Sequence, residues 1–159
     1  MRKPKTLSLI GWREWCVCSQ LDIPAIKAKI DTGAKTSSLH AANIVPFKKG
    51  DNKYVRFLVH PLQGHAEVEL ECEALVIDYR GVMSSNGHIE NRYVIRVEMQ
   101  LGTLKWPIDL TLSNRDPLKF RMLLGRDALS GHFMIDPYRS YLQGKFSQTE
   151  VRQFYQEMY

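Results

Sequence analysis

The chain has 159 residues, of which 44% are hydrophobic and 25% are charged, and its formal net charge is +5. This length suits one domain with a full core, and the composition excludes a disordered or collagen-like chain. The sequence has no run of about 18 apolar residues and no signal-peptide core near its start, so we expect a cytoplasmic protein without a membrane span. The basic balance favours acidic partners.

Alternating apolar and polar residues predict strands over most of the chain as far as residue 142. The clearest candidates are residues 25–30, 55–59, 68–75, 93–99 and 106–112. A short helix is expected at residues 126–129, and a second helix after Ser147, which is capped with the help of Glu150. We therefore predict an all-β domain over residues 1–142, followed by a helical tail over residues 143–159.

Three cysteines are present, at positions 16, 18 and 72, which is too few for a disulfide framework. A thiol often serves as a small apolar group, so we expect these side chains to be buried structural residues.

Residues 80–92 are polar, contain glycine and lie between two strong strand patterns, which predicts a long hairpin tip. Such a tip is either a mobile loop without a function or a functional lid. If it is a lid, Asn86, Gly87 and His88 would lie over a bound substrate. The alternative is a plain turn, because Asn-Gly is a strong turn signal.

Asp31 follows a predicted strand and begins the motif Asp31-Thr32-Gly33-Ala34. Two such carboxyls that share one proton supply both a base for water and an acid for the peptide carbonyl. Thr32 would hold two such turns together through its hydroxyl, and Gly33 would let the two backbones approach closely. The tripeptide alone, however, indicates no more than a turn.

A second motif follows at residues 120–129, where an apolar strand leads into Gly125, Arg126 and Asp127. With both motifs and the intervening hairpin in this order, the sequence resembles the retropepsin family of aspartic proteases. Residues 26–41, 59–63, 84–88 and 114–116 resemble more closely a bacterial branch that is often labelled ATP-dependent zinc protease and includes the RimB type. The resemblance runs from about residue 10 to residue 142.

The resemblance implies a single-domain closed barrel with a short helix after Gly125 and Arg126. For the RimB type it implies a peptidase that removes glutamate tails added to a ribosomal protein, with nucleic acid involved only through the ribosome. It assigns three groups of residues: catalytic Asp31, Thr32 and Gly33; substrate-binding Ala34, Lys35, Asn86, Gly87 and His88; and supporting Gly125, Arg126 and Asp127.

Lys35 departs from the viral retropepsin pattern, which has an aspartate at this position to pair with the Gly-Arg arginine. Arg126 therefore needs a different partner, for which Asp127 is a candidate. Lys35 near the cleft would favour an acidic substrate, and the equal alternative is a solvated turn lysine.

One Asp-Thr-Gly motif supplies one carboxyl, so the dyad requires a homodimer with two-fold symmetry. No His-Glu-x-x-His motif, structural-zinc spacing or phosphate-binding loop occurs, and we expect no metal and no cofactor. The function predicted is an aspartic endopeptidase for acidic, poly-glutamate-like peptides. The alternatives are a non-catalytic dimeric binding module of the same fold and a zinc-dependent protease.

Overall fold

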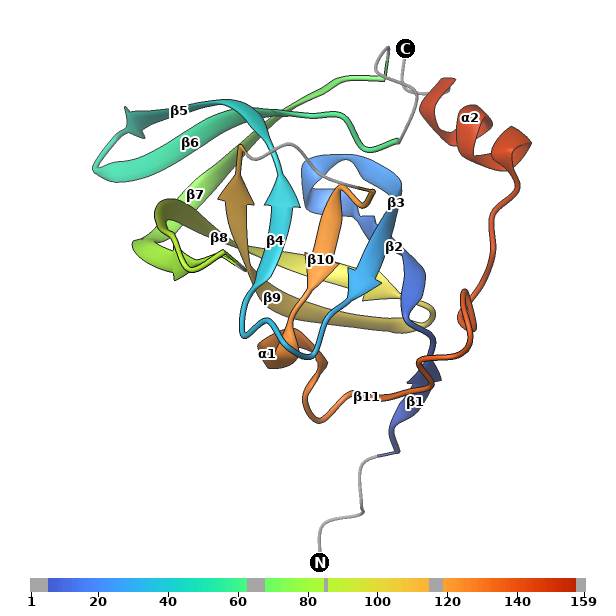
Figure 1. The fold of residues 1–159 in the computed structure, drawn as a ribbon. Coiled ribbons are helices and arrows are strands. Elements are labelled where there is room, and N and C mark those ends of the chain that lie inside the picture. The colour runs from blue at the N-terminus through green and yellow to red at the C-terminus, as the bar shows by residue number, and fades with distance from the viewer. Residues whose placement is uncertain (1–5, 63–67, 85, 115–118, 157–159) are drawn as a thin grey trace, which may run out of the picture.

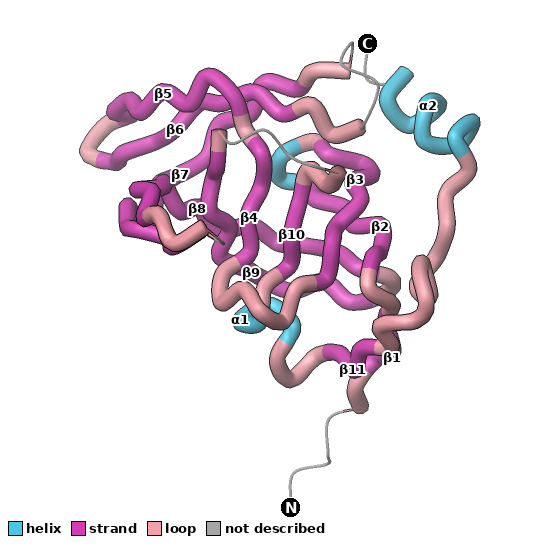
Figure 2. Tube along the Cα trace, in the orientation of Figure 1, coloured by secondary structure: helices cyan, strands magenta, loops and turns pink. Residues whose placement is uncertain are grey.

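The computed structural model describes residues 6–62, 68–84, 86–114 and 119–156, and most of them are in strands (Figures 1 and 2). The strands are β1 (Ser8–Ile10), β2 (Arg13–Cys18), β3 (Ile23–Ile30), β4 (Ser37–His40), β5 (Ala42–Lys49), β6 (Asn52–Val59), β7 (Leu70–Met83), β8 (Ile89–Leu101), β9 (Leu104–Ser113), β10 (Met122–Leu124) and β11 (Phe133–Ile135). The helices are a 3₁₀ turn (Ser19–Leu21), α1 (Arg126–Leu129) and α2 (Gln148–Gln156).

Six strands form a closed barrel in the order β2-β3-β10-β4-β9-β8, which the pairing of β8 with β2 completes. The alternation seen in the sequence explains the closure, because the inward residues of β3, β8 and β9 are buried. The predicted closed barrel is therefore confirmed, as are the strand candidates, which all fall within or overlap the observed strands.

Two long hairpins extend from the barrel, on the left in Figure 1. Strand β7 pairs with β8, and β6 and β5 follow it as the outer strands of the same sheet. The prediction of a hairpin tip over residues 80–92 was too long. Pairs from Arg80 opposite Arg92 to Met83 opposite Ile89 continue the ladder, since an exposed two-stranded ribbon pairs through its backbone even where its side chains are polar.

The core is a single apolar cluster that lies inside the barrel and under β6 and β7. All three cysteines belong to it as free, buried thiols, as expected. Burial raises the pKa of Cys18 to about 11 and that of Cys72 to about 12, so both thiols stay protonated at neutral pH.

The C-terminal helix packs against the barrel. Ser147 and Glu150 form the predicted capping pair, in which the Glu150 N–H donates to the Ser147 hydroxyl at 3.1 Å. Val151 and Tyr155 are buried, and the Tyr155 hydroxyl donates to the carbonyl of Ala25 in β3. No helix in the described part of the chain is both long and apolar enough to span a membrane.

Glu14 is a fully buried carboxylate that joins the start of β2 to the segment before α2. It accepts backbone N–H groups from Gly11 at 2.7 Å, Leu142 at 2.9 Å and Gln143 at 3.1 Å. A buried charge is tolerated only with such partners, so Glu14 fixes where the tail leaves the barrel.

Candidate active site

The parallel pair of β3 and β10 positions Asp31. The two strands are in register from Met122 opposite Ala28 to Leu124 opposite Ile30, and Asp31 is the next residue after β3. The Asp31 N–H donates to the carbonyl of Leu124 at 2.9 Å. Because both strands belong to the closed barrel, the backbone fixes the position of this aspartate.

The carboxylate of Asp31 is held within its own turn, residues 31–34, which we call the aspartate turn. Its Oδ1 accepts the Gly33 N–H at 2.9 Å, and its backbone carbonyl accepts the Ala34 N–H at 3.3 Å. The side chain is half-buried, and the Gly33 amide is its one hydrogen-bond donor among the described residues. The Oδ2 atom is therefore left to contact water, a substrate or a second carboxyl.

Helix α1 begins against the aspartate turn. The Arg126 N–H donates to the carbonyl of Ala34 at 2.7 Å, and its Nη1 donates to the carbonyl of Thr32 at 2.8 Å. The Asp127 N–H donates to the carbonyl of Lys35 at 3.0 Å. Arg126 thus contacts the turn directly, and within the described residues it forms no ion pair with Asp127, the partner considered from the sequence.

Gly125 lies where β10 passes the chain that follows the turn. A Cβ atom here would lie 2.6 Å from the Thr36 carbonyl carbon and 2.9 Å from the Ala34 oxygen, which is too close for any side chain. The Gly125 N–H donates to the hydroxyl of buried Ser37 at 3.0 Å. Sequence reasoning missed Ser37, although the hydroxyl run at positions 36–38 was the available signal.

A groove of about 680 Å³, which we call the turn groove, opens beside the aspartate turn. It lies between the chain just after Asp31, the β7 arm of the hairpin, the outer side of β8 and β9, and α1. The lining residues are Gly33, Ala34, Lys35, Thr36, Ser37, Arg80, Gly81, Val82, Met83, Arg96, Pro107, Ile108, Asp109, Asp127 and Ala128.

The turn groove carries cations, two of which are paired with acids. Arg96 Nε contacts Asp109 Oδ1 at 2.8 Å, and this hydrogen bond raises the pKa of the Arg96 guanidinium. Arg80 Nη1 lies 3.4 Å from Asp78 Oδ2. Lys35 is exposed and has no ion pair with any described residue. Neither arginine was predicted as a site residue, because Arg80 falls in the predicted hairpin tip and Arg96 is a polar position of a predicted strand.

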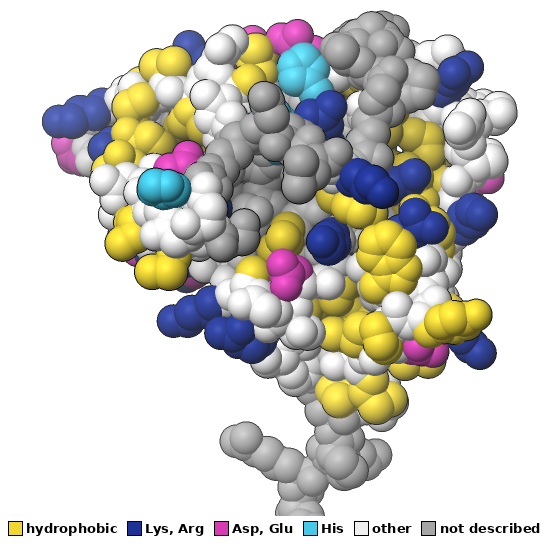
Figure 3. Space-filling model, in the orientation of Figure 1, with side chains coloured by type: hydrophobic (Ala, Val, Ile, Leu, Met, Phe, Trp, Pro, Cys, Tyr) yellow, Lys and Arg dark blue, Asp and Glu magenta, His cyan; other side chains and the backbone are white. Residues whose placement is uncertain are grey.

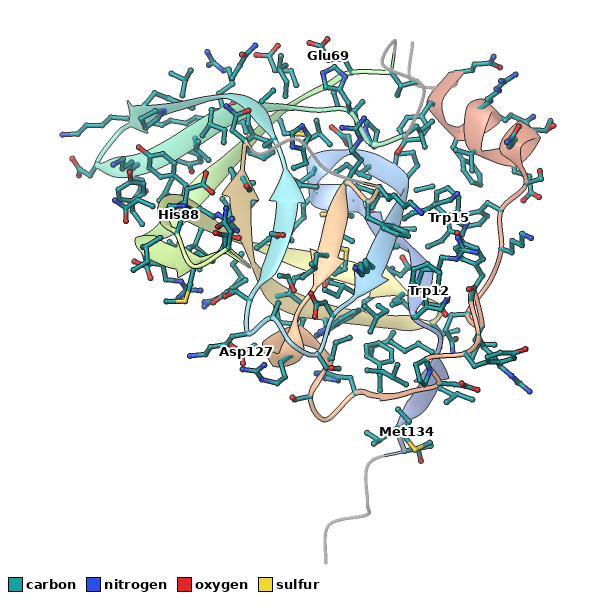
Figure 4. The ribbon with its side chains drawn as sticks, in the orientation of Figure 1. Trp12, Trp15, Glu69, His88, Asp127 and Met134 are labelled. Carbon is teal, nitrogen blue, oxygen red and sulfur yellow. The ribbon has the colours of Figure 1, made fainter. Side chains whose placement is uncertain are left out.

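Residues 86–88, in the turn of the β7–β8 hairpin, do not line the turn groove. Asn86, Gly87 and His88 are exposed, and the tip is closed by hydrogen bonds of its own, such as the Ser84 N–H to the His88 carbonyl at 2.8 Å. Figure 4 shows His88 at the tip, well away from Asp127. The structure brings the other predicted site residues together around the turn, but not these three.

In the described ranges no three His, Cys, Asp or Glu side chains are grouped closely enough to hold an ion.

A closed six-strand barrel with an Asp-Thr-Gly turn at the end of β3, braced by a Gly-Arg helix start, defines a retropepsin-like protein. The model of one family, described as "Retropepsin-like aspartic endopeptidase RimB", matches residues 9–146. The chain therefore belongs to this RimB-like family.

Curated relatives are named probable alpha-L-glutamate ligase. The protein from Shewanella halifaxensis is 49% identical over 147 residues, and that from Parasynechococcus marenigrum is 46% identical over the same length. Each match covers 92% of this chain and 32% of the relative, so the chain spans about a third of their length.

A solved structure of a Legionella pneumophila protein described as having unknown function has the same fold. Its TM-score is 0.72 at 27% identity, and the alignment covers 87% of this chain and 99% of that one.

Proposed function

We propose that this chain is an aspartic peptidase whose active form is a two-fold dimer, with the Asp31 carboxyls of two copies facing each other. The observation that carries the proposal is the aspartate turn, in which Gly33 holds Oδ1 and the β3–β10 pair holds the backbone. One chain supplies one half-buried carboxyl, and the chemistry requires two.

In the proposed reaction the two carboxyls share one proton. The ionised carboxylate removes a proton from a water molecule, whose oxygen attacks the peptide carbonyl carbon, while the protonated carboxyl donates its proton to the carbonyl oxygen. The resulting gem-diol collapses as the first carboxyl protonates the leaving nitrogen and the second regains a proton from a diol hydroxyl. The products are a carboxylic acid and an amine, and the dyad returns to its shared-proton state.

Exposed apolar residues in the β1–β11 sheet and shortly after it support a dimer. The small sheet of β1 and β11 lies outside the barrel (Figure 1), where Leu9 is 41% and Met134 53% exposed. Tyr138, three residues after β11, is 93% exposed. Side chains of this size are buried when a second copy covers them, and the exposed Thr32 and Gly33 would then face their symmetry mates.

The substrate class that we propose is an acidic peptide, such as a glutamate tail on a modified ribosomal protein. Cations from Lys35, Arg80 and Arg96 in the turn groove complement such a chain. The ligase name of the longer relatives fits this substrate, because an enzyme that builds glutamate tails and a peptidase that removes them recognise the same polymer.

The test is cleavage of poly-α-glutamate by the native chain, by Asp31→Asn and by Asp51→Asn, an exposed control aspartate. We expect Asp31→Asn to reduce the rate by about 10³-fold or more, because the dyad loses its shared proton, and Asp51→Asn to leave it unchanged. Sedimentation of the native chain should show a dimer. Equal cleavage by the native chain and Asp31→Asn would rule out the aspartic mechanism.

A second candidate function is a non-catalytic domain that binds acidic tails. The name of the curated relatives favours it, since a ligase also benefits from a domain that holds its product. A native chain that binds oligo-α-glutamate, stays monomeric and cleaves nothing at acidic or neutral pH would support this candidate instead.

A further inference from the structure

A second cavity lies on the outer wall of the barrel, beneath the segment that leads into α2. Its volume is about 330 Å³, and we call it the tail pocket. It shares no lining residue with the turn groove. Basic and aromatic side chains form much of its wall: Trp15, Lys27, Arg121, Tyr141, Lys145 and Arg152. Figure 4 shows Trp15 on this side of the barrel, next to the chain that descends from α2.

The charge of the tail pocket has one sign. Four of its lining residues are cations and none is an aspartate or glutamate. No described carboxylate forms an ion pair with any of the four, in contrast to the paired arginines of the turn groove. Figure 3 shows Lys and Arg side chains gathered around apolar ones on this face, below α2.

Two of these cations, Lys27 and Arg121, have surroundings that favour binding of an anion. Lys27 Nζ lies 5.3 Å from the centroid of the Trp15 ring and 5.9 Å from that of Tyr141, so aromatic faces on two segments orient its ammonium. The Nε atom of Arg121 is buried and has no hydrogen-bond partner among the described residues. A buried guanidinium nitrogen without an acceptor is costly, and the positive charge of Arg121 is left for an anion in the pocket.

The start of α2 adds to the positive electrostatic potential of the tail pocket. Ser147 and Gln148 line the pocket, and the positive end of the helix dipole lies there. Glu150 is the acidic residue in the first turn, and it is engaged with the Ser147 N–H at 3.4 Å rather than lining the cavity.

Strand β3 connects the tail pocket to the aspartate turn. Lys27 and Lys29 are two residues apart in β3, so they point to the same outer face, and Lys29 is exposed. Asp31 comes two residues later. At about 3.3 Å per residue the separation from Lys27 to Asp31 is about 13 Å, which an extended peptide spans with about four residues.

We propose that the tail pocket is a second binding site for the acidic peptide, which holds carboxylate side chains away from the bond that is cleaved. The choice of an acidic peptide rests on the proposed function. The site itself rests on the unpaired cations, the aromatic walls and the orphaned Arg121 nitrogen.

The test measures binding in the full chain carrying Asp31→Asn, so that cleavage does not interfere. The probe is a short fluorescein-labelled oligo-α-glutamate, followed by anisotropy. Lys145→Gln with Arg152→Gln removes two exposed pocket cations, and Lys48→Gln with Lys105→Gln removes two exposed lysines elsewhere. We expect the pocket pair to weaken binding about fivefold and the control pair less than about twofold, with the difference shrinking at high salt.

If the pocket pair and the control pair of substitutions weaken probe binding equally, the proposed site is wrong, because the probe is then attracted only by the net charge of the protein. Displacement of the probe by a single-stranded RNA oligonucleotide at lower concentration than by unlabelled oligo-glutamate would overturn the choice of an acidic peptide. Native cleavage of poly-glutamate, measured separately, distinguishes the two proposals. No cleavage with pocket-dependent binding defeats only the proposed function, whereas cleavage with pocket-independent binding defeats only this inference.

Discussion

The turn groove and the tail pocket are both basic, but they are built differently. In the turn groove, Arg96 and Arg80 have aspartate partners that fix the orientation of each guanidinium. In the tail pocket, Lys27 and Arg121 have no acidic partner among the described residues. Paired cations offer directed hydrogen bonds with little net field, whereas unpaired cations attract any nearby anion. The groove is therefore suited to orient a substrate and the pocket to capture one.

The two cavities also depend on different parts of the chain. The turn groove is formed where residues 33–37 meet α1 and the walls made by β7, β8 and β9. The tail pocket exists only because the segment around Tyr141 folds back on β2, where Glu14 holds the backbone of Leu142. Damage to one cavity should therefore leave the other intact.

The largest change in stability is expected for Glu14→Ala, which disrupts the tail pocket. Glu14→Ala leaves three backbone donors without their acceptor, so we expect the free energy of unfolding to fall by about 3 kcal/mol. Urea unfolding measures this change, and Glu98→Ala, at an exposed position in β8, is the matched control. In the folded fraction, binding of oligo-glutamate at the pocket should be lost while the aspartate turn persists. Equal stability of the two variants would contradict the role of Glu14.

Gly125→Ala disturbs the turn groove instead of the tail pocket. The new Cβ would meet the Thr36 backbone at 2.6 Å, so β10 and the aspartate turn must move apart. We expect a loss of about 2 kcal/mol in stability and a fall of at least about tenfold in peptidase rate. Thermal unfolding and poly-glutamate cleavage measure the two effects. Unchanged activity in the folded variant would show that Gly125 does not set the turn.

Lys35→Gln tests whether the unpaired cation of the turn groove contributes to substrate binding. We expect the KM for poly-glutamate to rise about threefold with kcat unchanged, because a single exposed charge contributes little and acts equally in the ground and transition states. Lys119→Gln, at another exposed position, is the control. If both variants raise KM to the same degree, Lys35 is a solvated turn lysine.

The smallest expected effect has the opposite sign. Asp109→Asn removes the charge that pairs with Arg96, so the groove should come to resemble the pocket. We expect the KM for an acidic peptide to fall about twofold and the pKa of Arg96 to move back toward its ordinary value. Steady-state kinetics at low and high salt would detect the change, and an increase in KM would show that the pair orients substrate.

The sequence was sufficient for the barrel and for the aspartate turn. Much of both is encoded locally: alternation along β3 and β8 sets the strands, and the Asp31 side chain accepts the N–H of Gly33, two residues later. The Gly125 position was recognisable from its motif, and its close approach to Thr36 gives the reason for the glycine.

What the sequence did not reveal depends on contacts between distant residues. Glu14 meets Gln143, 129 positions away, and nothing in the pattern around either residue predicts the other. The tail pocket is assembled from β2, β3, the residue before β10, α2 and the segment before α2, so its cations are scattered among ordinary surface residues in the sequence. The hairpin tip was placed too broadly because ladder pairing at Arg80 and Gly81 follows the backbone rather than polarity.

One pair of residues, Val17 opposite Gln100, completes the pairing of β2 with β8 and so closes the barrel. Every other junction around the barrel has a longer register, including the three pairs of β3 with β10 beside Asp31. We expect the strand pairing of the barrel to open first at this junction when the protein is heated, because it has the fewest paired residues. The aspartate turn lies on a different junction, so we expect opening between β2 and β8 to leave the β3–β10 pairs beside Asp31 in place.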